Sequence, residues 1–368
     1  MDAESSQVRF SDVCIIGRGA YGTVSSAHDA DLAGKRVAVK HVKDVFESQM
    51  AAKRMLREIR VHRLLQREAP NVAVALLGAV IPPNKFTEVS LVMELMDCTL
   101  HAVCRNPEYT LSDEQIRYLA QQLIWAVHSM HKCGIVHRDI KPQNVLVNAD
   151  CTLRLCDFGM ARPLSGQDKF LWSDYVTTRW YRAPEMCVNN RLAEYTKASD
   201  MWSVGCVIAE MLLGGRALFP GKSSEHQRSL ITTMLGPAPS GYLGDAFCAP
   251  PSSFDSGSAV IIGDLLDYRF AAALPGGSSL LRGLLKYHPS ERMTAYDAMS
   301  HAFFSSCEDA GDAGDAGDAG DAGKLPTLPP PKADDSSSSD PFAFDMFFMS
   351  TLELRSLIQK ELSDLAGT

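Results

Sequence analysis

The sequence lacks the features that mark several classes of protein. No apolar run reaches the ~18 residues that a membrane-spanning helix needs, and the start, Met1 to Glu4, has neither a basic nor an apolar segment typical of a secretory signal. Its 10 cysteines include no Cys-x-x-Cys pair, so no disulfide scaffold, structural zinc site or redox motif is indicated. We expect a soluble protein of the cytoplasm that does not bind membranes, with entry into the nucleus left open.

Basic residues are also fewer than acidic residues. The 368 residues include 36 Lys and Arg against 44 Asp and Glu, a formal net charge of −8. This balance argues against non-specific nucleic-acid binding and leaves specific partners open. Hydrophobic residues at 46% and charged residues at 22% exclude a wholly disordered or fibrous chain. At roughly 150 residues per domain, the length predicts about two domain-sized units.

Two parts of the chain differ in the spacing of their apolar residues. Before residue 95, short β-branched runs bounded by glycines predict strands, with one helix over about 48–66. Beyond residue 97 the spacing is mainly helical. We expect a tail over 1–9, a small β-rich unit over 10–95, and a larger helical unit over 96–304 with a surface insert at 238–260.

The last part of the chain changes character twice. Five Asp-Ala-Gly repeats begin at Asp309 and are followed by a Pro- and Ser-rich stretch, which predicts an acidic low-complexity linker over 305–340. Within 341–368, Ser350 and Glu353 form a capping-box pattern before an apolar stripe. An amphipathic helix needs a surface to pack on, and the folded domain is the simplest one.

A glycine-rich stretch separates the first two expected strands. Gly17, Gly19 and Gly22 have no Cβ, so the backbone there could approach a phosphate closely. A tight hairpin turn explains the pattern about as well, and a strand follows instead of a helix, which argues against a dinucleotide-binding fold. Lys40 ends an apolar strand 18 residues after Gly22, where its ammonium needs either an anion or solvent.

One block decides between these interpretations. His137-Arg138-Asp139-Ile140-Lys141-Pro142-Gln143-Asn144 is followed, 18 residues after Asp139, by Asp157-Phe158-Gly159, and Ala183-Pro184-Glu185 comes 26 residues after Asp157. In this order and spacing, the chain resembles the protein kinases. The resemblance implies an α+β, bilobal protein kinase fold, with a small β-rich N-lobe containing one regulatory helix and a larger helical C-lobe.

The resemblance also implies a role for each motif residue. The catalytic residues would be Asp139, Lys141 and Lys40, and the Mg²⁺ ligands would be Asn144 and Asp157. The ATP-binding residues would be Ile16, Gly17, Arg18, Gly19, Ala20, Tyr21, Gly22, Thr23, Val24, Ala38, Lys40, Glu58, Met93, Glu94 and Met96. Glu185 with Arg292 matches the family's structural ion pair, and Asp200 matches its buried aspartate, so these three are expected to be structural.

A narrower resemblance is to the mitogen-activated protein (MAP) kinases, which are Ser/Thr kinases of the CMGC type. Residues 51–59, 93–97 and 176–185 are similar to that family's regulatory helix, hinge and the signature after the activation loop. The segment from Pro341 resembles the family's C-terminal extension, which packs on the N-lobe. Cyclin-dependent kinases share much of the core but lack this extension.

A Ser-Asp-Tyr motif stands where the MAP kinases have Thr-x-Tyr, so Ser173 and Tyr175 are expected to be phosphorylated. Two phosphates would add roughly −3 to −4 charge at pH 7. By resemblance, the first phosphate would be bound by Arg57, Arg138 and Arg162, and the phosphotyrosine by Arg179 and Arg182. Such pairs would order the loop and fix the helix that carries Glu58. The alternative is that these arginines pair only with nearby carboxylates.

The function implied is ATP-dependent, proline-directed phosphorylation of protein Ser and Thr, by a monomer that binds no nucleic acid. The partners would be an upstream dual-specificity MAP kinase kinase, phosphatases and Ser/Thr-Pro substrates. Their basic docking motifs would bind Asp309 and Asp312, for which a solvated linker is the alternative. Two other functions stay open: a cyclin-dependent-like Ser/Thr kinase, and a catalytically silent docking scaffold.

Overall fold

The computed structural model describes residues 9–19, 22–80, 87–164, 178–188, 195–240, 242, 276–304, 342 and 349–366. The chain divides into two compact units. The first consists of Met1–Asp97, Cys156–Ala161 and Pro331–Thr368, and the second of Cys98–Leu155 and Arg162–Pro330. Within the described ranges, no helix combines the length and the apolar character needed to cross a membrane. The observed division therefore places 156–161 with the first unit, although the sequence suggested one boundary at 95.

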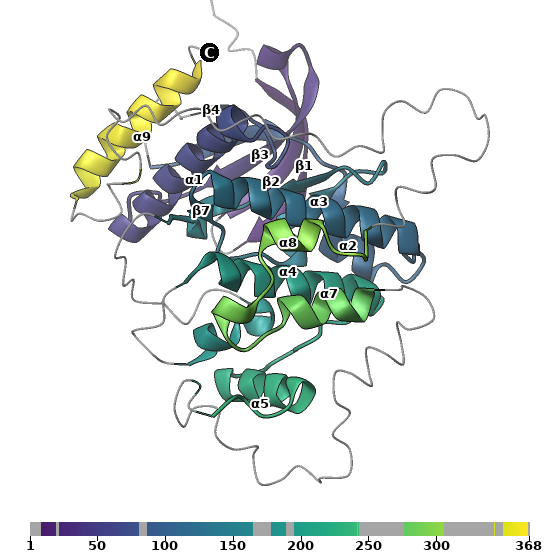
Figure 1. The fold of residues 1–368 in the computed structure, drawn as a ribbon. Helices are drawn as coiled ribbons and strands as arrows, with labels where there is room; N and C mark the ends of the chain where they lie inside the picture. The colour runs from purple at the N-terminus through teal and green to yellow at the C-terminus, as the bar shows by residue number, and fades with distance from the viewer. Residues whose placement is uncertain are drawn as a thin grey trace, which may run out of the picture. The chain divides into compact units, whose positions relative to one another are not determined.

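The first unit is built on a five-stranded antiparallel sheet with the order β1-β2-β3-β5-β4 (Figure 1). The strands are β1 (Phe10–Gly19), β2 (Gly22–Asp29), β3 (Lys35–Val42), β4 (Leu76–Val80) and β5 (Val89–Glu94), with the short helix η1 (Ala30–Leu32) between β2 and β3. Val37, Val39 and Val92 pack with Ala27 in a buried cluster of this sheet. The strands expected before residue 95 are thus confirmed.

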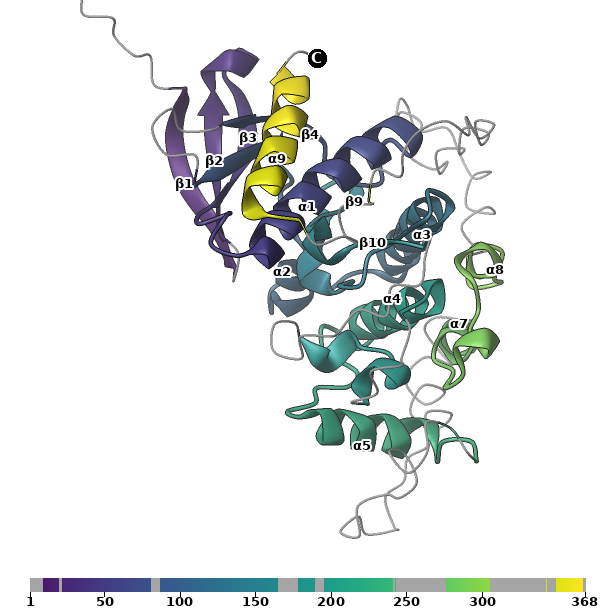
Figure 2. The same ribbon diagram turned by 90° about the vertical axis from the view of Figure 1, so that its left-hand side faces the viewer.

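Two helices cover part of this sheet. Helix α1 (Gln49–Glu68) begins after Ser48, whose side chain accepts a hydrogen bond from the Ala51 N–H, as an N-cap should. Helix α9 (Thr351–Ala366) packs on α1 and β4, and Figures 1 and 2 show α9 running beside α1. The packing of the C-terminal segment on the folded domain is therefore confirmed.

The cap expected for α9 is also present. The Ser350 N–H donates to Glu353 Oε2 at 2.7 Å, and the Glu353 N–H donates to Ser350 Oγ at 3.2 Å, which completes a capping box. Leu354, Ile358 and Leu362 form the buried stripe of the helix. The sequence pattern therefore specified both the start and the buried face of α9.

The second unit is mainly helical. Its longer helices are α3 (Asp113–Lys132), α4 (Lys197–Leu212) and α5 (Ser224–Leu235); the shorter ones are α2 (Leu100–Arg105), α7 (Gly277–Leu284) and α8 (Ala295–Met299). Its short strands are β6 (Cys98–Thr99), β7 (Ile135–Val136), β8 (Val145–Val147), β9 (Leu153–Leu155) and β10 (Arg162–Pro163), paired as β6-β8-β9 and β10-β7. Trp202 of α4 stacks on Phe219 in the core.

Short 3₁₀ helices lie next to the sequence motifs. They are η2 (Pro142–Asn144), η3 (Phe158–Met160), η4 (Arg179–Tyr181), η5 (Pro184–Cys187) and η7 (Pro289–Glu291), of which η3 belongs to the first unit. The acidic linker expected over 305–340 lies outside the described residues, as does nearly all of the surface insert expected at 238–260.

Candidate active site

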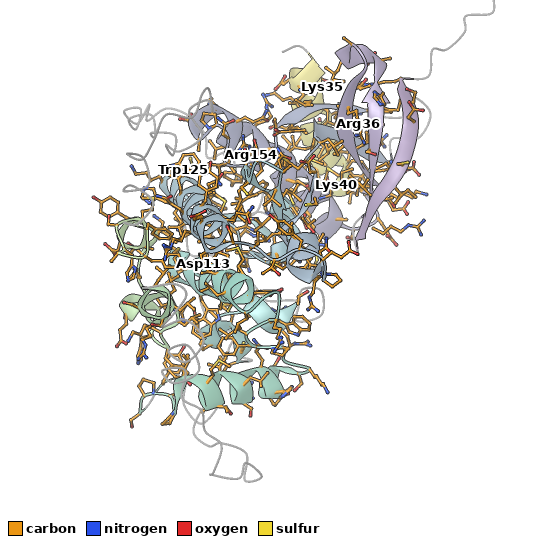
Figure 3. The ribbon with its side chains drawn as sticks, turned by 90° about the vertical axis from the view of Figure 1, so that its right-hand side faces the viewer. Lys35, Arg36, Lys40, Asp113, Trp125 and Arg154 are labelled. Atoms are coloured by element: carbon orange, nitrogen blue, oxygen red, sulfur yellow. The ribbon has the colours of Figure 1, made fainter. Side chains whose placement is uncertain are left out.

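Three charged side chains from distant parts of the chain meet in the first unit. Lys40 of β3 donates from Nζ to Glu58 Oε1 of α1 at 2.6 Å and to Asp157 Oδ1 at 3.2 Å. Lys40 is only 13% exposed and Glu58 only 5%. Figure 3 shows Lys40 further along β3 than Lys35 and Arg36. The cluster therefore joins β3, α1 and the residue before η3.

Electrostatics keep Lys40 in its charged form. Burial alone would lower the pKa of this ammonium, but the negative charges of Asp157 and Glu58 raise the pKa well above the ordinary lysine value. Lys40 therefore remains a cation throughout the neutral range. A fixed, partly desolvated cation of this kind is suited to binding phosphate oxygens.

A cavity of about 380 Å³ opens at this cluster. Its lining residues come from the start of β2, from β3 and from α1, and include Gly22, Thr23, Lys40, Arg54, Glu58 and Asp157. Five of the sequence-based candidates, namely Gly22, Thr23, Lys40, Glu58 and Asp157, thus line one cavity, and side chains of both charges contribute to its wall.

The three glycines near the cavity are not equivalent. A Cβ on Gly22 would lie 2.3 Å from the His41 carbonyl oxygen of β3, which is far inside contact distance. A Cβ on Gly17 or Gly19 would approach no neighbour closer than 3.9 Å. Gly22 is therefore required by the packing of β2 on β3. The freedom to approach a ligand remains at Gly17 and Gly19; Ala20 and Tyr21 lie outside the described residues.

Strand pairing places two other nucleotide-site candidates together. Ala38 of β3 lies opposite Met93 of β5, and both side chains are buried. Glu94 is fixed by the Ala75 N–H, which donates to Glu94 Oε2 at 3.2 Å, and Met96 is buried. Ile16 of β1 is 53% exposed, so it contributes little to the core of the sheet.

Arginines of α1 hold the segment after Asp157. Arg57 is buried and donates from Nη1 to the Gly159 carbonyl oxygen at 2.5 Å. Arg54 packs over Gly159, where an added Cβ would lie 2.7 Å from Arg54 Cγ. In the same segment, Phe158 packs edge-on against His62 of α1, with the ring centroids 4.9 Å apart. Helix α1 therefore organises both Glu58 and the Asp157 segment.

The second unit contains a more compact cluster. Lys141 donates from Nζ to Asp139 Oδ2 at 2.6 Å. Asn144 donates from Nδ2 to the Asp139 carbonyl at 2.8 Å and to Asp139 Oδ2 at 3.1 Å. Because the amide nitrogen is a donor here, the Asn144 side-chain oxygen is the atom with the chemistry of a hard-cation ligand. Asp139 and Asn144 are both buried.

The buried side chain of Asp200, on α4, stabilises the backbone next to this cluster. Its fully buried carboxylate accepts from the backbone N–H groups of His137 and Arg138 at 2.9 and 3.0 Å, and from His131 and Tyr195. Burial alone would raise the pKa of Asp200, but the hydrogen bond from His131 and the neighbouring His137 lower it below the usual value. The structural role expected for Asp200 is therefore consistent with its contacts.

Backbone strain accompanies both clusters. Arg138, next to Asp139, has φ 71°, and Asp157 has φ 63°, a left-handed conformation that costs free energy in residues other than glycine. For Arg138, Asp200 holds the strained peptide through its backbone hydrogen bond. Five other non-glycine residues of the described chain also have positive φ, so this strain accompanies the two clusters without identifying them.

The expected ion pair of Glu185 and Arg292 is present. Arg292 Nη2 lies 2.5 Å from Glu185 Oε2, Nη1 lies 2.7 Å from Oε1, and Ser199 also donates to Oε1. Both partners are buried, so this bidentate pair fixes η5 to the segment after η7. A structural role is what the geometry supports.

The arginines expected to bind phosphate already have partners. Arg57 donates to Gly159, Arg138 lies over the Tyr195 ring with its Cζ 5.4 Å from the centroid, and Arg179 donates to the Lys222 carbonyl oxygen at 3.3 Å. Arg182 is buried and Arg162 is half-buried. Ser173 and Tyr175, like Asp309 and Asp312, lie outside the described residues, so their roles stay predictions.

Sequence reasoning missed the contacts that α1 makes with α9. Arg60 and Arg63 both pair with Glu361, about 300 residues further along the chain. The signal was a basic helix and an acidic stripe on a C-terminal helix, but neither pattern identifies the other as its partner.

Comparison with known proteins assigns the family. Residues 10–304 match the model of the protein kinase domain. Mitogen-activated protein kinase 8 of Arabidopsis thaliana is 40% identical over 301 residues, 80% of this chain and 50% of that protein. Mitogen-activated protein kinase 13 of Oryza sativa subsp. indica is 39% identical over 305 residues, 82% of this chain and 58% of that protein. The chain thus spans only about half of these relatives' length, and it belongs to the protein kinase family.

Proposed function

We propose that this chain is a MAP kinase-like Ser/Thr protein kinase that transfers the γ-phosphoryl group of ATP to protein hydroxyls. The observation that carries the proposal is the buried Lys40 cation held between Glu58 and Asp157 at the edge of a cavity, in a chain whose protein kinase match covers residues 10–304. Phosphoryl transfer depends mainly on positioning and charge neutralisation, and this cluster supplies both. In this proposal Lys40 binds the α- and β-phosphates of ATP.

The compact cluster of the second unit would act on the protein substrate. Asp139 would accept or orient the proton of the attacking Ser or Thr hydroxyl. Lys141, whose Nζ is hydrogen-bonded to Asp139, would offset the negative charge that develops on the transferred group. The Asn144 amide fixes the Asp139 carboxylate through its 3.1 Å hydrogen bond, so this carboxylate is preoriented before a substrate arrives.

The available donors fit Mg²⁺, which prefers carboxylate and carbonyl oxygens. We propose that Asp157 and Asn144 supply these ligands, through a carboxylate oxygen and the amide oxygen. When bound, the ion would neutralise phosphate charge. The chain's own contribution is to hold the Asp157 backbone in its strained conformation, at φ 63°, with Arg57 and Arg54 packed against the residues that follow.

Regulation would follow from phosphorylation of Ser173 and Tyr175. The arginines proposed to bind the first phosphate are Arg57, Arg138 and Arg162, and those for the second are Arg179 and Arg182. Arg57 supports this proposal because it lies on α1, one residue before Glu58. A phosphate recruited to Arg57 would act on the same helix that pairs with Lys40, which makes an order switch physically reasonable.

The proposed substrates are Ser and Thr followed by proline, and the proposed partners are an upstream dual-specificity kinase, phosphatases and substrates with basic docking motifs. Arg182, which is buried, would shape the pocket for the proline. Asp309 and Asp312 would attract the basic motifs. The similarity to mitogen-activated protein kinases 8 and 13 supports this class of activity.

The test is phosphorylation of a Thr-Pro peptide and its Thr-Ala twin by the purified chain. The reaction is run before and after dual phosphorylation of Ser173 and Tyr175, verified by mass spectrometry, with Asp157→Ala as the inactive control. We expect strong transfer only to the Thr-Pro peptide and only after dual phosphorylation. Equal activity in both states would refute the switch. No transfer in either state would favour a docking scaffold.

A further inference from the structure

Helix α1 has charged contacts on two sides. On one side Glu58 pairs with Lys40, and Arg57 donates to the Gly159 carbonyl. Arg60 is two residues after Glu58, and at 3.6 residues per turn it therefore lies about 200° further around the helix. Arg60 and Arg63 lie away from the cavity, and Glu361 of α9 meets them there.

Glu361 binds the two arginines with both of its carboxylate oxygens. Arg60 donates from Nε to Glu361 Oε1 at 2.8 Å, and Arg63 donates from Nη1 to Oε2. The Glu361 side chain is only 15% exposed and that of Arg60 only 16%. Charge-assisted bonds with both carboxylate oxygens and limited solvent contact are stronger and more directional than an exposed pair. Asp364 is a weaker neighbour, 3.7 Å from Arg63 and 48% exposed.

The helix that carries Glu361 is fixed independently of this ion pair. Leu354, Ile358 and Leu362 are buried, and α9 packs on both α1 and β4, as Figures 1 and 2 let the reader follow. At its N-terminal end, the Arg355 guanidinium lies 5.8 Å from the centre of the Phe46 ring, just before α1 begins. The carboxylate is therefore presented to α1 from a helix that is already anchored.

We propose that Glu361 is a positioning residue for phosphoryl transfer: by holding Arg60 and Arg63 it fixes the rotation of α1 and keeps Glu58 in hydrogen-bonding reach of Lys40. The inference rests on the proposed function. A helix with its side chains has a radius of about 5–6 Å, so a rotation of about 20° moves the Glu58 carboxylate by about 2 Å. The 2.6 Å bond to Lys40 does not survive such a shift.

The first experiment compares Glu361→Gln with the wild type in phosphorylation of the Thr-Pro peptide, with Ser173 and Tyr175 phosphorylated to the same extent in both proteins. Glu361→Gln keeps the shape and removes the charge, and Lys360→Gln, one residue away on the exposed face, is the matched control. We expect kcat to fall about five- to tenfold, with the KM for peptide unchanged, for a coupling of ordinary size. The thermal midpoint should stay close to that of the wild type, because the apolar stripe still anchors α9. A wild-type kcat in Glu361→Gln would overturn the proposal.

The second experiment reads the Lys40–Glu58 pair directly and needs no kinase activity. Acetylation by acetic anhydride is followed by mass spectrometry at Lys40, with Lys35 as an internal reference. In Glu361→Gln we expect faster acetylation of Lys40 alone, because a weakened pair lowers the pKa of its ammonium. An unchanged ratio of the two rates would overturn the proposal. If the wild type transfers no phosphate, the proposed function fails, while the acetylation ratio still decides whether Glu361 controls the pair.

A charge exchange separates positioning from mere destabilisation. Arg60→Glu and Glu361→Arg each place like charges together. The double variant restores the attractive pair at position 60 but leaves Arg63 beside a like charge. We expect each single variant to lose kcat and the double variant to recover part of it. A double variant as impaired as the two single losses combined would refute a direct role for this contact.

Discussion

The two charged clusters are built in opposite ways. In the second unit, Asp139, Lys141 and Asn144 lie within six residues of one another. One buried carboxylate, Asp200, fixes the backbone of the two residues just before them. In the first unit, Lys40, Glu58 and Asp157 come from three segments, and their meeting depends on how α1 packs. A cluster whose residues share one loop is fixed once that loop is folded. A cluster that includes a residue of a helix, as Glu58 of α1, forms or separates when the helix moves. Under the proposed function, the first unit would be the place where activity is controlled.

The largest effect should come from the local cluster's own chemistry. Asp139→Asn keeps the size of the side chain and removes the base, so kcat/KM should fall on the order of 10²–10⁴-fold. The midpoint of urea unfolding should change little, because the surrounding loop is held by Asp200. Steady-state kinetics on the Thr-Pro peptide provide the measurement. A loss below tenfold would mean that Asp139 is not the proton acceptor.

Removing the support of the local cluster should destabilise the fold itself. In Asp200→Asn, the carboxylate that accepts from His137, Arg138, His131 and Tyr195 becomes a neutral amide, and half of its acceptor capacity is lost. We expect about 2–4 kcal/mol less free energy of unfolding by urea titration. An equal loss in Glu353→Gln, whose carboxylate is exposed, would show that Asp200 has no special role.

The helix-spanning cluster should respond more gradually. Glu58→Gln retains one hydrogen-bond acceptor for Lys40, and Asp157 remains as a charged partner. We therefore expect about a 10–100-fold loss of kcat/KM, smaller than for Asp139→Asn, with little change in unfolding. Kinetics of the two variants under the same conditions test the comparison. A larger loss for Glu58→Gln than for Asp139→Asn would reverse it.

Within the first unit, substitutions of two glycines should separate an effect on stability from an effect on ATP binding. Gly22→Ala places a Cβ 2.3 Å from the His41 carbonyl oxygen and should cost about 1–3 kcal/mol of stability. Gly19→Ala meets no close neighbour, so its thermal midpoint should stay within about 2 °C of wild type while its KM for ATP rises. Equal thermal shifts for the two variants would contradict this assignment.

Much of this architecture follows from local sequence patterns. The β-branched runs predicted the strands of the first unit, and Ser350 with Glu353 predicted the start of α9, because strands and caps depend on neighbours within a few residues. The motif residues could be assigned because each lies at a fixed spacing from the others. None of these inferences required knowledge of the tertiary structure.

The rest depends on contacts between distant segments. The need for glycine at position 22 comes from the carbonyl of His41 on the neighbouring strand, and the partner of Arg57 is the carbonyl of Gly159, about 100 residues later. Glu361 reaches Arg60 across about 300 residues. A pattern of charges on one helix shows that a partner is possible, but only packing determines which residue takes that place.

The smallest expected effect concerns the hydrogen-bonded cap at the start of α9. Hydrogen bonds from the backbone N–H and the hydroxyl of Ser350 lower the pKa of the Glu353 carboxyl. A lowered pKa means that the cap is complete above the ordinary glutamate value of about 4.3 and is lost as the pH falls through the lowered pKa of the folded state. In the wild type, the protection of the amides in the first turn of α9 against exchange should fall over that acidic range. Glu353→Gln, measured at the same pH values, should show no such loss of protection.

Because the apolar stripe and Glu361 lie further along α9, kcat should be unaffected by Glu353→Gln, in contrast to Glu361→Gln. An equal loss of kcat in both variants would mean that α9 acts on α1 as a whole, and not through the one carboxylate that touches its arginines.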